Sequence, residues 1–329
     1  MTKIKAVVQY LEQIAPPVYQ ESYDNAGLIV GDVETEVTGV LCCLDSTEAV
    51  IEEALRRNCN LVVAHHPIVF RGLKRLTGRT YVERTLLMAI KNDVAIYAIH
   101  TNLDNVYHRG VNAEIATRIG LERTQILAPK AGQLKRVSVY GNEQGIQQFV
   151  TDLPKGIADV LSTSNGVAEL LVPPPEVATC LLNLERAQLR YVVQAVENAD
   201  AQVGSGMIGW LPDSVAPLAF LKQLKTQMAV GCVKYTALPE RPVQKVAVCG
   251  GAGGFLLRTA IGQKADVFIT SDYKYHEFFD ADKKIIIVDI GHFESEQFTI
   301  PLLRNIISDK FTNFAALCTE VRTNPVNYL

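Results

Sequence analysis

Most histidines of this chain stand where an apolar run gives way to polar residues. His65 and His66 follow the apolar residues 61–64 (LVVA), and His292 ends the run 283–292 (KKIIIVDIGH). In open α/β sheets, ligands collect beyond the carboxyl ends of the strands. Imidazole and carboxylate groups together suit zinc, iron, manganese or nickel. The sequence therefore indicates a metal site at five strand ends, whose polar residues are Asp45, His65, His66, His100, Asp104, Asp272, His276, His292 and Glu296.

The spacing of these residues favours a site for two metal ions. His292 and Glu296 are four residues apart where a helix should begin, so a helix would place both side chains on one face. His65 and His66 cannot point the same way on a straight strand. At a strand end, where the backbone turns, the two rings can diverge and bind different ions. A glutamate that bridges the ions would complete a two-metal site.

Each signal has a simpler interpretation when it is taken alone. A single histidine at a strand end is more often a polar surface residue, and Asn and Asp in 100–104 (HTNLD) are ordinary turn formers. We expect Asp45 to be a turn residue beside a helix, while His276 fits a helix N-terminal turn as well as a place in the site. The loop 249–254 (CGGAGG) could offer N–H groups to a phosphate. It lacks the Lys-Ser/Thr pair of a P-loop, so tight turning and close packing are expected instead.

Alternating strand and helix signals surround these positions. Continuous apolar runs predict buried strands, and amphipathic stretches predict helices. In the first third, the predicted strands are 37–45, 61–67 and 94–104, and the predicted helices are 46–58, 80–93 and 110–121. In the last third, the predicted strands begin at 243, 265 and 283, and the predicted helices cover 255–264 and 293–308. This rhythm predicts an α/β fold with mostly parallel, helix-covered sheets.

The middle of the chain has a different character. Residues 134–202 show a β-α-β-α pattern but contain no histidine and no reactive cluster. The Gly-rich stretch 203–214 (VGSGMIGWLPDS) is interpreted as the return into the first domain. We therefore predict a discontinuous core domain of residues 1–133 and 203–329, interrupted by an inserted α+β domain at 134–202.

Composition limits the classes of partner. The chain of 329 residues is 48% hydrophobic and 20% charged, with a formal net charge of −3, which gives no reason to expect nucleic acid or an anionic membrane. No stretch approaches the roughly 18 apolar residues of a transmembrane helix, and residues 1–20 resemble an amphipathic helix more than a signal peptide. The seven cysteines form no C-x-x-C pair, which suits reduced thiols in a cytoplasmic protein.

Six segments together resemble a known family. They are YDNAGLIVGD at 23–32, AHHPIVF at 64–70, HTNLD at 100–104, VAVCGGAGG at 246–254, DVFITSDYKYHE at 266–277 and IIIVDIGHFESE at 285–296. Their order and spacing resemble the Ngg-interacting-factor-like family of dinuclear-metal hexameric proteins, whose members carry the name GTP cyclohydrolase 1 type 2 homologue. The resemblance extends over most of the chain outside the middle segment.

The resemblance implies two similar α/β lobes around a dinuclear metal site, assembled as a toroidal homohexamer. It implies that two divalent ions (zinc, iron, manganese or nickel) are held by His65, His66, Asp104, His292 and Glu296, with Glu296 as the bridging ligand. His100 is similar to a nearby site histidine of the family, and Asn25 to a polar residue that faces the site. The segment 134–202 resembles a shortened form of the PII/CutA-type, ferredoxin-like insert of longer members.

Two functions are compatible with such a site. The first is a metal-dependent hydrolase, in which a hydroxide between the metals attacks an electrophilic carbon or phosphorus of a nucleotide or related small molecule. His100 and His276 would then be catalytic residues that shuttle protons. The alternative is a non-enzymatic metal-binding or regulatory hexamer with the insert as a sensor module. A protein whose histidines are incidental would hold no metal.

Overall fold

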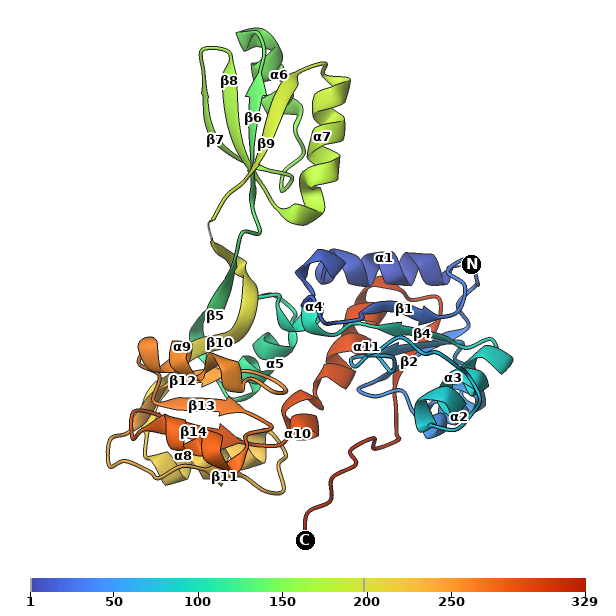
Figure 1. Ribbon diagram of the computed structural model, residues 1–329, viewed down its shortest axis with the longest axis vertical. Coiled ribbons are helices and arrows are strands. Elements are labelled where there is room, and N and C mark those ends of the chain that lie inside the picture. The colour runs from blue at the N-terminus through green and yellow to red at the C-terminus, as the bar shows by residue number, and fades with distance from the viewer. Residues whose placement is uncertain (1, 198) are drawn as a thin grey trace. The chain divides into compact units, whose positions relative to one another are not determined.

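The structure, a computed structural model, describes residues 2–197 and 199–329. The chain divides into two compact units, which are treated separately below. Unit 1 comprises Met1–Ala128 and Gln202–Leu329, and unit 2 comprises Pro129–Ala201, which overlaps the insert expected at 134–202. The chain is a mixed α/β protein with several sheets, as predicted (Figure 1).

The first sheet of unit 1 is mostly parallel and is buried on both faces. Its strand order is β1 (Gly27–Val30), β4 (Ala95–Ala98), β3 (Leu61–Ala64), β2 (Gly39–Cys43) and β15 (Ala315–Cys318). β1 is antiparallel to β4, and the other neighbours are parallel. Alternate strand residues pack on different helices, which are α2 (Glu48–Arg56) and α3 (Tyr81–Lys91) on one face and α1 (Ile4–Ile14) and α11 (Thr299–Lys310) on the other. Burial on both faces explains why these strands are continuous apolar runs in the sequence.

The second sheet of unit 1 has a parallel centre. Its order is β11 (Lys234–Tyr235), β14 (Ile286–Asp289), β13 (Val267–Thr270), β12 (Val243–Val248), β10 (Ala199–Val215) and β5 (Glu122–Ala131). β12, β13 and β14 are parallel to one another, whereas β10 and β11 run antiparallel to their neighbours β12 and β14. The covering helices are α9 (Leu257–Gly262) on one face and α5 (Val111–Arg118) and α8 (Pro217–Gln227) on the other.

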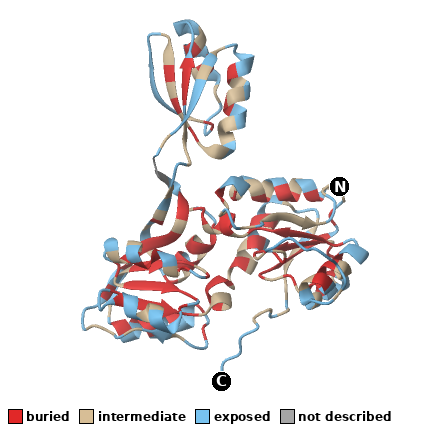
Figure 2. Ribbon diagram, viewed as in Figure 1, coloured by how far each residue is buried: buried red, intermediate tan, exposed pale blue. Residues whose placement is uncertain are grey.

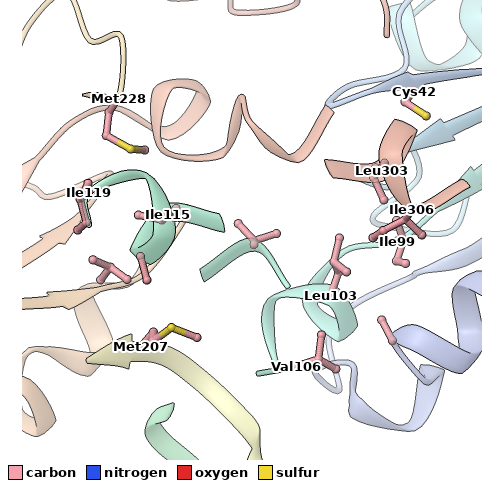
Figure 3. Close-up of a cluster of buried hydrophobic side chains, with 14 of the residues drawn as sticks. Cys42, Ile99, Leu103, Val106, Ile115, Ile119, Met207, Met228, Leu303 and Ile306 are labelled. Atoms are coloured by element: carbon pink, nitrogen blue, oxygen red, sulfur yellow. The ribbon is translucent and has the colours of Figure 1, made fainter. Parts of the chain in front are cut away.

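One hydrophobic core joins the two sheets of unit 1. We call the first sheet with its covering helices the first lobe, and the second sheet with its covering helices the second lobe. Helix α5 contacts the short helices α4 (Thr101–Asp104) and α10 (His292–Glu296) as well as α11. Figure 3 shows part of this core, in which Ile99, Leu103, Leu303 and Ile306 belong to the same cluster as Ile115 and Met207. Because the lobes share buried side chains, polar groups at their facing edges are held in a fixed relation.

One expectation about unit 1 was wrong in detail. The closing helix predicted over 293–308 is two helices, α10 and α11, because Pro301 has no amide hydrogen and its ring cannot follow an uninterrupted helical turn. Pro301 is instead in the first turn of α11, where a missing N–H costs nothing. The Gly-rich stretch 203–214, interpreted as the return into the first domain, lies in strand β10 after unit 1 resumes at Gln202, and its residues Val203, Met207 and Ile208 are buried.

Unit 2 is a four-stranded antiparallel sheet with two helices. Its elements follow the order β6 (Lys135–Tyr140), α6 (Glu143–Asp152), β7 (Asp159–Ser164), β8 (Val167–Val172), α7 (Val177–Arg186) and β9 (Arg190–Ala195). The sheet order is β7-β8-β6-β9, and all three pairings are antiparallel. The sequence pattern missed the edge strands β7 and β9, because nearly all their side chains are exposed and carry no apolar alternation (Figure 2).

No helix in the described part of the chain is long and apolar enough to cross a membrane. The longest of these helices, α11, has 12 residues, whereas a membrane-spanning helix needs about 20.

Candidate metal centre

A cavity of about 770 Å³ lies between the two lobes of unit 1. The carboxyl ends of β3, β4, β13 and β14 all reach it, as expected for the ligand edge of α/β sheets. The chemically active side chains on its wall are Asp45, His66, His100 and Asp104 after strands of the first lobe, and Asp272, His292 and Glu296 after strands of the second. His65 is fully buried beneath this wall.

His65 presents a lone pair to two carboxylates. Its Nδ1 is 2.8 Å from the backbone carbonyl oxygen of Ile99, and a carbonyl can only accept, so Nδ1 carries the hydrogen. In the neutral ring Nε2 is then an acceptor. Nε2 lies 3.6 Å from Asp104 Oδ1 and 3.8 Å from Glu296 Oε1, and neither Nε2 nor Asp104 Oδ1 has a hydrogen-bond partner although both atoms are buried. When both carboxylates are ionised, three acceptors face one another, and a cation between them would satisfy all three.

Glu296 offers its second oxygen to two other histidines. Oε2 of Glu296 is 2.9 Å from His66 Nε2 and 3.2 Å from His292 Nε2. His292 and Glu296 are both in α10, so the spacing of four residues places them on one face as predicted. The ligand atoms of His65, His66 and Glu296 lie within 4.8 Å of one another, which is close enough to hold a metal ion. The two Glu296 oxygens therefore face different histidines.

In three of the rings, a carboxylate at Nδ1 fixes the orientation of the imidazole. His66 Nδ1 lies 2.8 Å from Asp45 Oδ1, and His292 Nδ1 lies 2.6 Å from Asp272 Oδ2. His100 Nδ1 lies 2.8 Å from Asp24 Oδ1, and its ring centroid is 5.4 Å from those of His65 and His66. Metal-binding histidines usually donate the other ring N–H to a carboxylate or a carbonyl, which fixes the ring and leaves Nε2 for the metal. All four rings of the cluster show this arrangement.

The electrostatics of the cluster favour positive charge at its centre. Burial opposes ionisation of Glu296, but the surrounding histidines outweigh burial and hold the pKa of its carboxyl well below the usual value. Burial would lower the pKa of His66, yet Asp45 and Glu296 raise it to about 10. Burial and then the charge of Glu296 raise the pKa of Asp104 well above its ordinary range. The raised pKa values of His66 and Asp104 reflect carboxylates held close together, whose charge bound cations would neutralise.

The glycine loop packs against Glu296 and does not form a phosphate cradle. Three of its glycine N–H groups are already used, since Gly250 donates to Asn112, Gly251 to Ser295 and Gly253 to Thr270. Gly251 has a φ of +63°, and a Cβ built on it would lie 2.5 Å from Glu296 Oε1. Close packing, the interpretation favoured from the sequence, therefore describes this loop.

Two residues singled out from the sequence lie elsewhere. His276 is exposed in the short helix Tyr275–Ala281, contacts the ring of Tyr275, and is not among the residues that line the cavity. Asn25 donates from its side chain to the carbonyl of Val69 and also does not line the cavity. The neighbouring Asp24 is the residue that reaches the cluster.

Sequence reasoning missed two of the four groups that orient the histidines, Asp24 and the carbonyl of Ile99, and gave the other two no orienting role. Asp45, expected to be only a turn residue, binds His66 Nδ1, and Asp24 binds His100 from 76 positions earlier in the chain. The carbonyl of Ile99 has no sequence signature at all. Asp45 and Asp272 could have been recognised as partners because each follows a buried strand, β2 of the first sheet and β13 of the second. Asp24 carries no such signal, since it stands before the first strand.

Comparison with known proteins gives a consistent result over the whole chain. A family model described as Duf34/NIF3 (NGG1p interacting factor 3) matches residues 2–325. Proteins named GTP cyclohydrolase 1 type 2 homolog from Staphylococcus epidermidis and Bacillus subtilis are each 28% identical, with alignments that cover 99% and 98% of this chain and 100% and 98% of those proteins. A Bacillus cereus protein related to NIF3 superposes with a TM-score of 0.86 at 26% identity, over 99% of both chains. A Staphylococcus aureus protein superposes with a TM-score of 0.84 at 25% identity, also over 99% of both chains.

The resemblance inferred from the six sequence segments is thereby confirmed. The match spans nearly the full chain, includes the segments that carry the histidine cluster, and agrees in sequence and in fold. The chain belongs to the Duf34/NIF3 (NGG1p interacting factor 3) family.

Proposed function

We propose that the cluster binds two divalent metal ions with Glu296 between them. The observation that carries this proposal is the buried contact of His65 Nε2 with Asp104 Oδ1, in which both atoms lack a partner. His65 and Asp104 would hold one ion together with Glu296 Oε1. His66 and His292 would hold the other with Glu296 Oε2. The donors are imidazole and carboxylate, so zinc, iron, manganese and nickel all fit.

His100 would lie beside these ligands as the proton shuttle predicted from the sequence. Its Nδ1 is anchored by Asp24, as the other rings are anchored, and hydrogen bonds from His100 and Thr101 overcome burial to hold the pKa of Asp24 at about 2. An ionised Asp24 keeps the hydrogen on Nδ1 and leaves Nε2 free. The proton-shuttle roles of His100 and His276 remain predictions, and the exposed position of His276 gives its role no support.

The reaction supported best is metal-dependent hydrolysis of a nucleotide or related small molecule. Two bound divalent ions lower the pKa of water and polarise the bond under attack. The protein supplies the ligands, orients them through Asp24, Asp45 and Asp272, and buries one side of the site. The names of the relatives, GTP cyclohydrolase 1 type 2 homolog, favour a nucleotide but say nothing of this chain's own substrate.

The rim of the cavity suits a phosphorylated ring compound. Tyr23 and Phe70 line it and are 70% and 53% exposed, which leaves their ring faces available for stacking. The loop after Phe70 carries Arg71, Lys74 and Arg75, which are exposed and form no ion pair among the described residues. Cations next to a metal site attract an anionic substrate.

The alternative is a metal-binding regulatory protein that uses unit 2 as a sensor. The β-α-β-β-α-β order of unit 2, with its sheet order β7-β8-β6-β9, supports a ferredoxin-like domain of the PII/CutA kind. A homohexamer is proposed from the family resemblance, and a cytoplasmic location from the seven free cysteines. Loss of a ligand response, with hydrolysis unchanged, on removal of unit 2 would favour a sensor attached to an enzyme.

Metal analysis of the wild type and of Glu296→Gln tests the proposal. We expect about two metal ions per wild-type chain, and one or fewer in Glu296→Gln, because the amide loses the charge that screens the repulsion between two cations. Glu83→Gln is the matched control, since Glu83 is also a buried helix carboxylate, but it bonds to Thr77 and Arg79 and does not line the cavity. Loaded protein is then assayed with GTP, dinucleotides and phosphoesters. Absence of metal from the wild type would overturn the metal site, and absence of turnover on a loaded site would overturn the hydrolase.

A further inference from the structure

The chain segment after β15 leaves the first sheet and enters the wall of the cavity. Thr319 still bonds to the sheet, since its amide donates to the carbonyl of Cys42. Farther along the chain, the cavity is lined by Asn324, Pro325, Val326 and Tyr328. We call residues 319–329 the C-terminal segment. The segment is therefore part of the cavity wall, although none of the proposed metal ligands belongs to it.

Thr323 in this segment bonds to the group that orients His66. Its hydroxyl donates to Asp45 Oδ2 at 2.7 Å, while Asp45 Oδ1 bonds to His66 Nδ1 at 2.8 Å. Each oxygen of Asp45 thus has its own partner. A carboxylate with a single partner can still rotate about its χ2 torsion, which is broad, whereas one with a partner on each oxygen has its plane fixed. The hydroxyl thereby limits the directions available to the His66 ring.

The next residue ties the segment to the second lobe. Asn324 Nδ2 donates to Glu294 Oε1 at 2.8 Å, and Glu294 is in α10, two residues before Glu296. Thr323 is therefore held from both directions, by the sheet bond of Thr319 behind it and by the Asn324–Glu294 bond ahead of it. The hydroxyl is presented to Asp45 by a segment that is fixed at both ends.

We propose that Thr323 is a positioning residue for the metal bound by His66, acting through Asp45. This inference rests on the proposed metal site. Partners beyond the direct ligands set ring orientation and ligand basicity, and their loss typically lowers metal affinity by 10–100-fold. Because Thr323 acts one step farther out than Asp45, its loss should cost about tenfold, the lower end of this range.

The test measures the affinity of the full chain for zinc and for manganese alone, by competition with a chelator. Thr323→Val keeps the shape and removes the hydroxyl, so we expect the weaker of two binding steps to lose about tenfold. Thr323→Ser keeps the hydroxyl and should restore wild-type affinity. Thr319→Val is the matched control. Thr319 is in the same C-terminal segment, but its hydroxyl bonds to the carboxylate of Glu53, and neither residue lines the cavity. The control should bind both ions as the wild type does.

A double substitution separates positioning from a general structural role. If Thr323 acts through Asp45, adding Thr323→Val to Asp45→Asn should cost no further affinity. Additive losses, or equal affinities for Thr323→Val and Thr319→Val, would overturn the proposal while leaving the metal site itself intact. Thermal unfolding with chelator present should be the same for Thr323→Val and the wild type, because a loss there would show a purely structural role. A wild type that binds no metal would instead overturn the proposed function, and this inference with it.

Discussion

His65 Nε2 lies 3.6 Å from Asp104 Oδ1, and both atoms are buried without a hydrogen-bond partner. Buried polar atoms in proteins are nearly always paired, so this pair is a stability cost that the fold accepts. The cost is explained if a cation belongs between the two atoms. Functional sites often retain such local conflicts because relieving them would remove the function.

Asp104→Asn should make the metal-free protein more stable and weaken metal binding. The amide of asparagine is neutral at every pH, so the substitution removes the stability cost of keeping a buried carboxyl whose pKa is raised, and its nitrogen can donate to His65 Nε2. We expect the free energy of unfolding in chelator to rise by about 1–2 kcal/mol. Metal content should fall by about one ion per chain. Denaturant unfolding and elemental analysis measure the two effects.

Asp104→Ala separates the two causes, since alanine removes the ligand but offers no donor to His65. It should lose the same metal ion and gain less stability than the asparagine variant. Equal metal content in all three proteins would show that Asp104 is not a ligand.

Gly251→Ala should disturb the cluster although it replaces none of the proposed ligands. Gly251 has a φ of +63°, where an L-residue costs about 1–2 kcal/mol, and the added Cβ would lie 2.5 Å from Glu296 Oε1. We expect a lower melting temperature and weaker metal binding, measured by calorimetry and chelator competition. Gly72→Ala is the control, because its Cβ would meet no atom within 4 Å. Metal affinity equal to that of the control would mean that Glu296 can move away at no cost.

Glu83 should give the protein a defined loss of stability in acid. Hydrogen bonds from the Thr77 amide and hydroxyl and from the Arg79 amide hold its pKa at about 2, against 4.5 ordinarily. The folded pKa is depressed, so the stabilisation is complete above pH 4.5 and is lost as the pH falls toward 2. Glu83→Gln should be less stable than the wild type at neutral pH, and the difference should shrink between these two pH values. Urea unfolding at a series of pH values measures it.

Glu12 should change the pH dependence of stability in the opposite direction. Burial raises the pKa of its carboxyl, so ionisation costs stability as the pH rises through that pKa. Glu12→Gln should therefore be more stable than the wild type at neutral pH and should lose that advantage in acid.

For Glu83, a Glu83→Gln protein whose free energy of unfolding runs parallel to that of the wild type at every pH would contradict the assigned hydrogen bonds.

Removal of unit 2 should leave the metal site intact. Its hydrophobic core lies wholly within 137–191, and the three clusters of unit 1 include no residue of that range. We expect a chain with residues 132–198 replaced by a short Gly-Ser linker to unfold cooperatively and to bind as many metal ions as the full chain. Residues 134–197 alone should fold as well. Loss of metal from the shortened chain would show that unit 2 supports the site.

The sequence by itself determined the α/β class and the residue types that gather at the cluster. Apolar runs buried on both faces are a local signal, and so is the change to histidine or carboxylate at each strand end, which is why nine strand-end residues could be named in advance. The narrower set of five proposed ligands, His65, His66, Asp104, His292 and Glu296, came from the family resemblance. The helical spacing of His292 and Glu296 was also readable because both lie in one turn of helix.

Only the tertiary structure decided which groups orient those ligands. Asp24 reaches His100 across 76 positions, and Thr323 reaches Asp45 across 278. The carbonyl of Ile99 selects the tautomer of His65, and every residue has such a carbonyl. Contacts between distant segments depend on how two lobes pack around one core, and a polar residue in a loop has the same local pattern whether it faces water or a buried ring. Each candidate ligand is marked by a local sequence signal, whereas its orientation is a property of the folded chain.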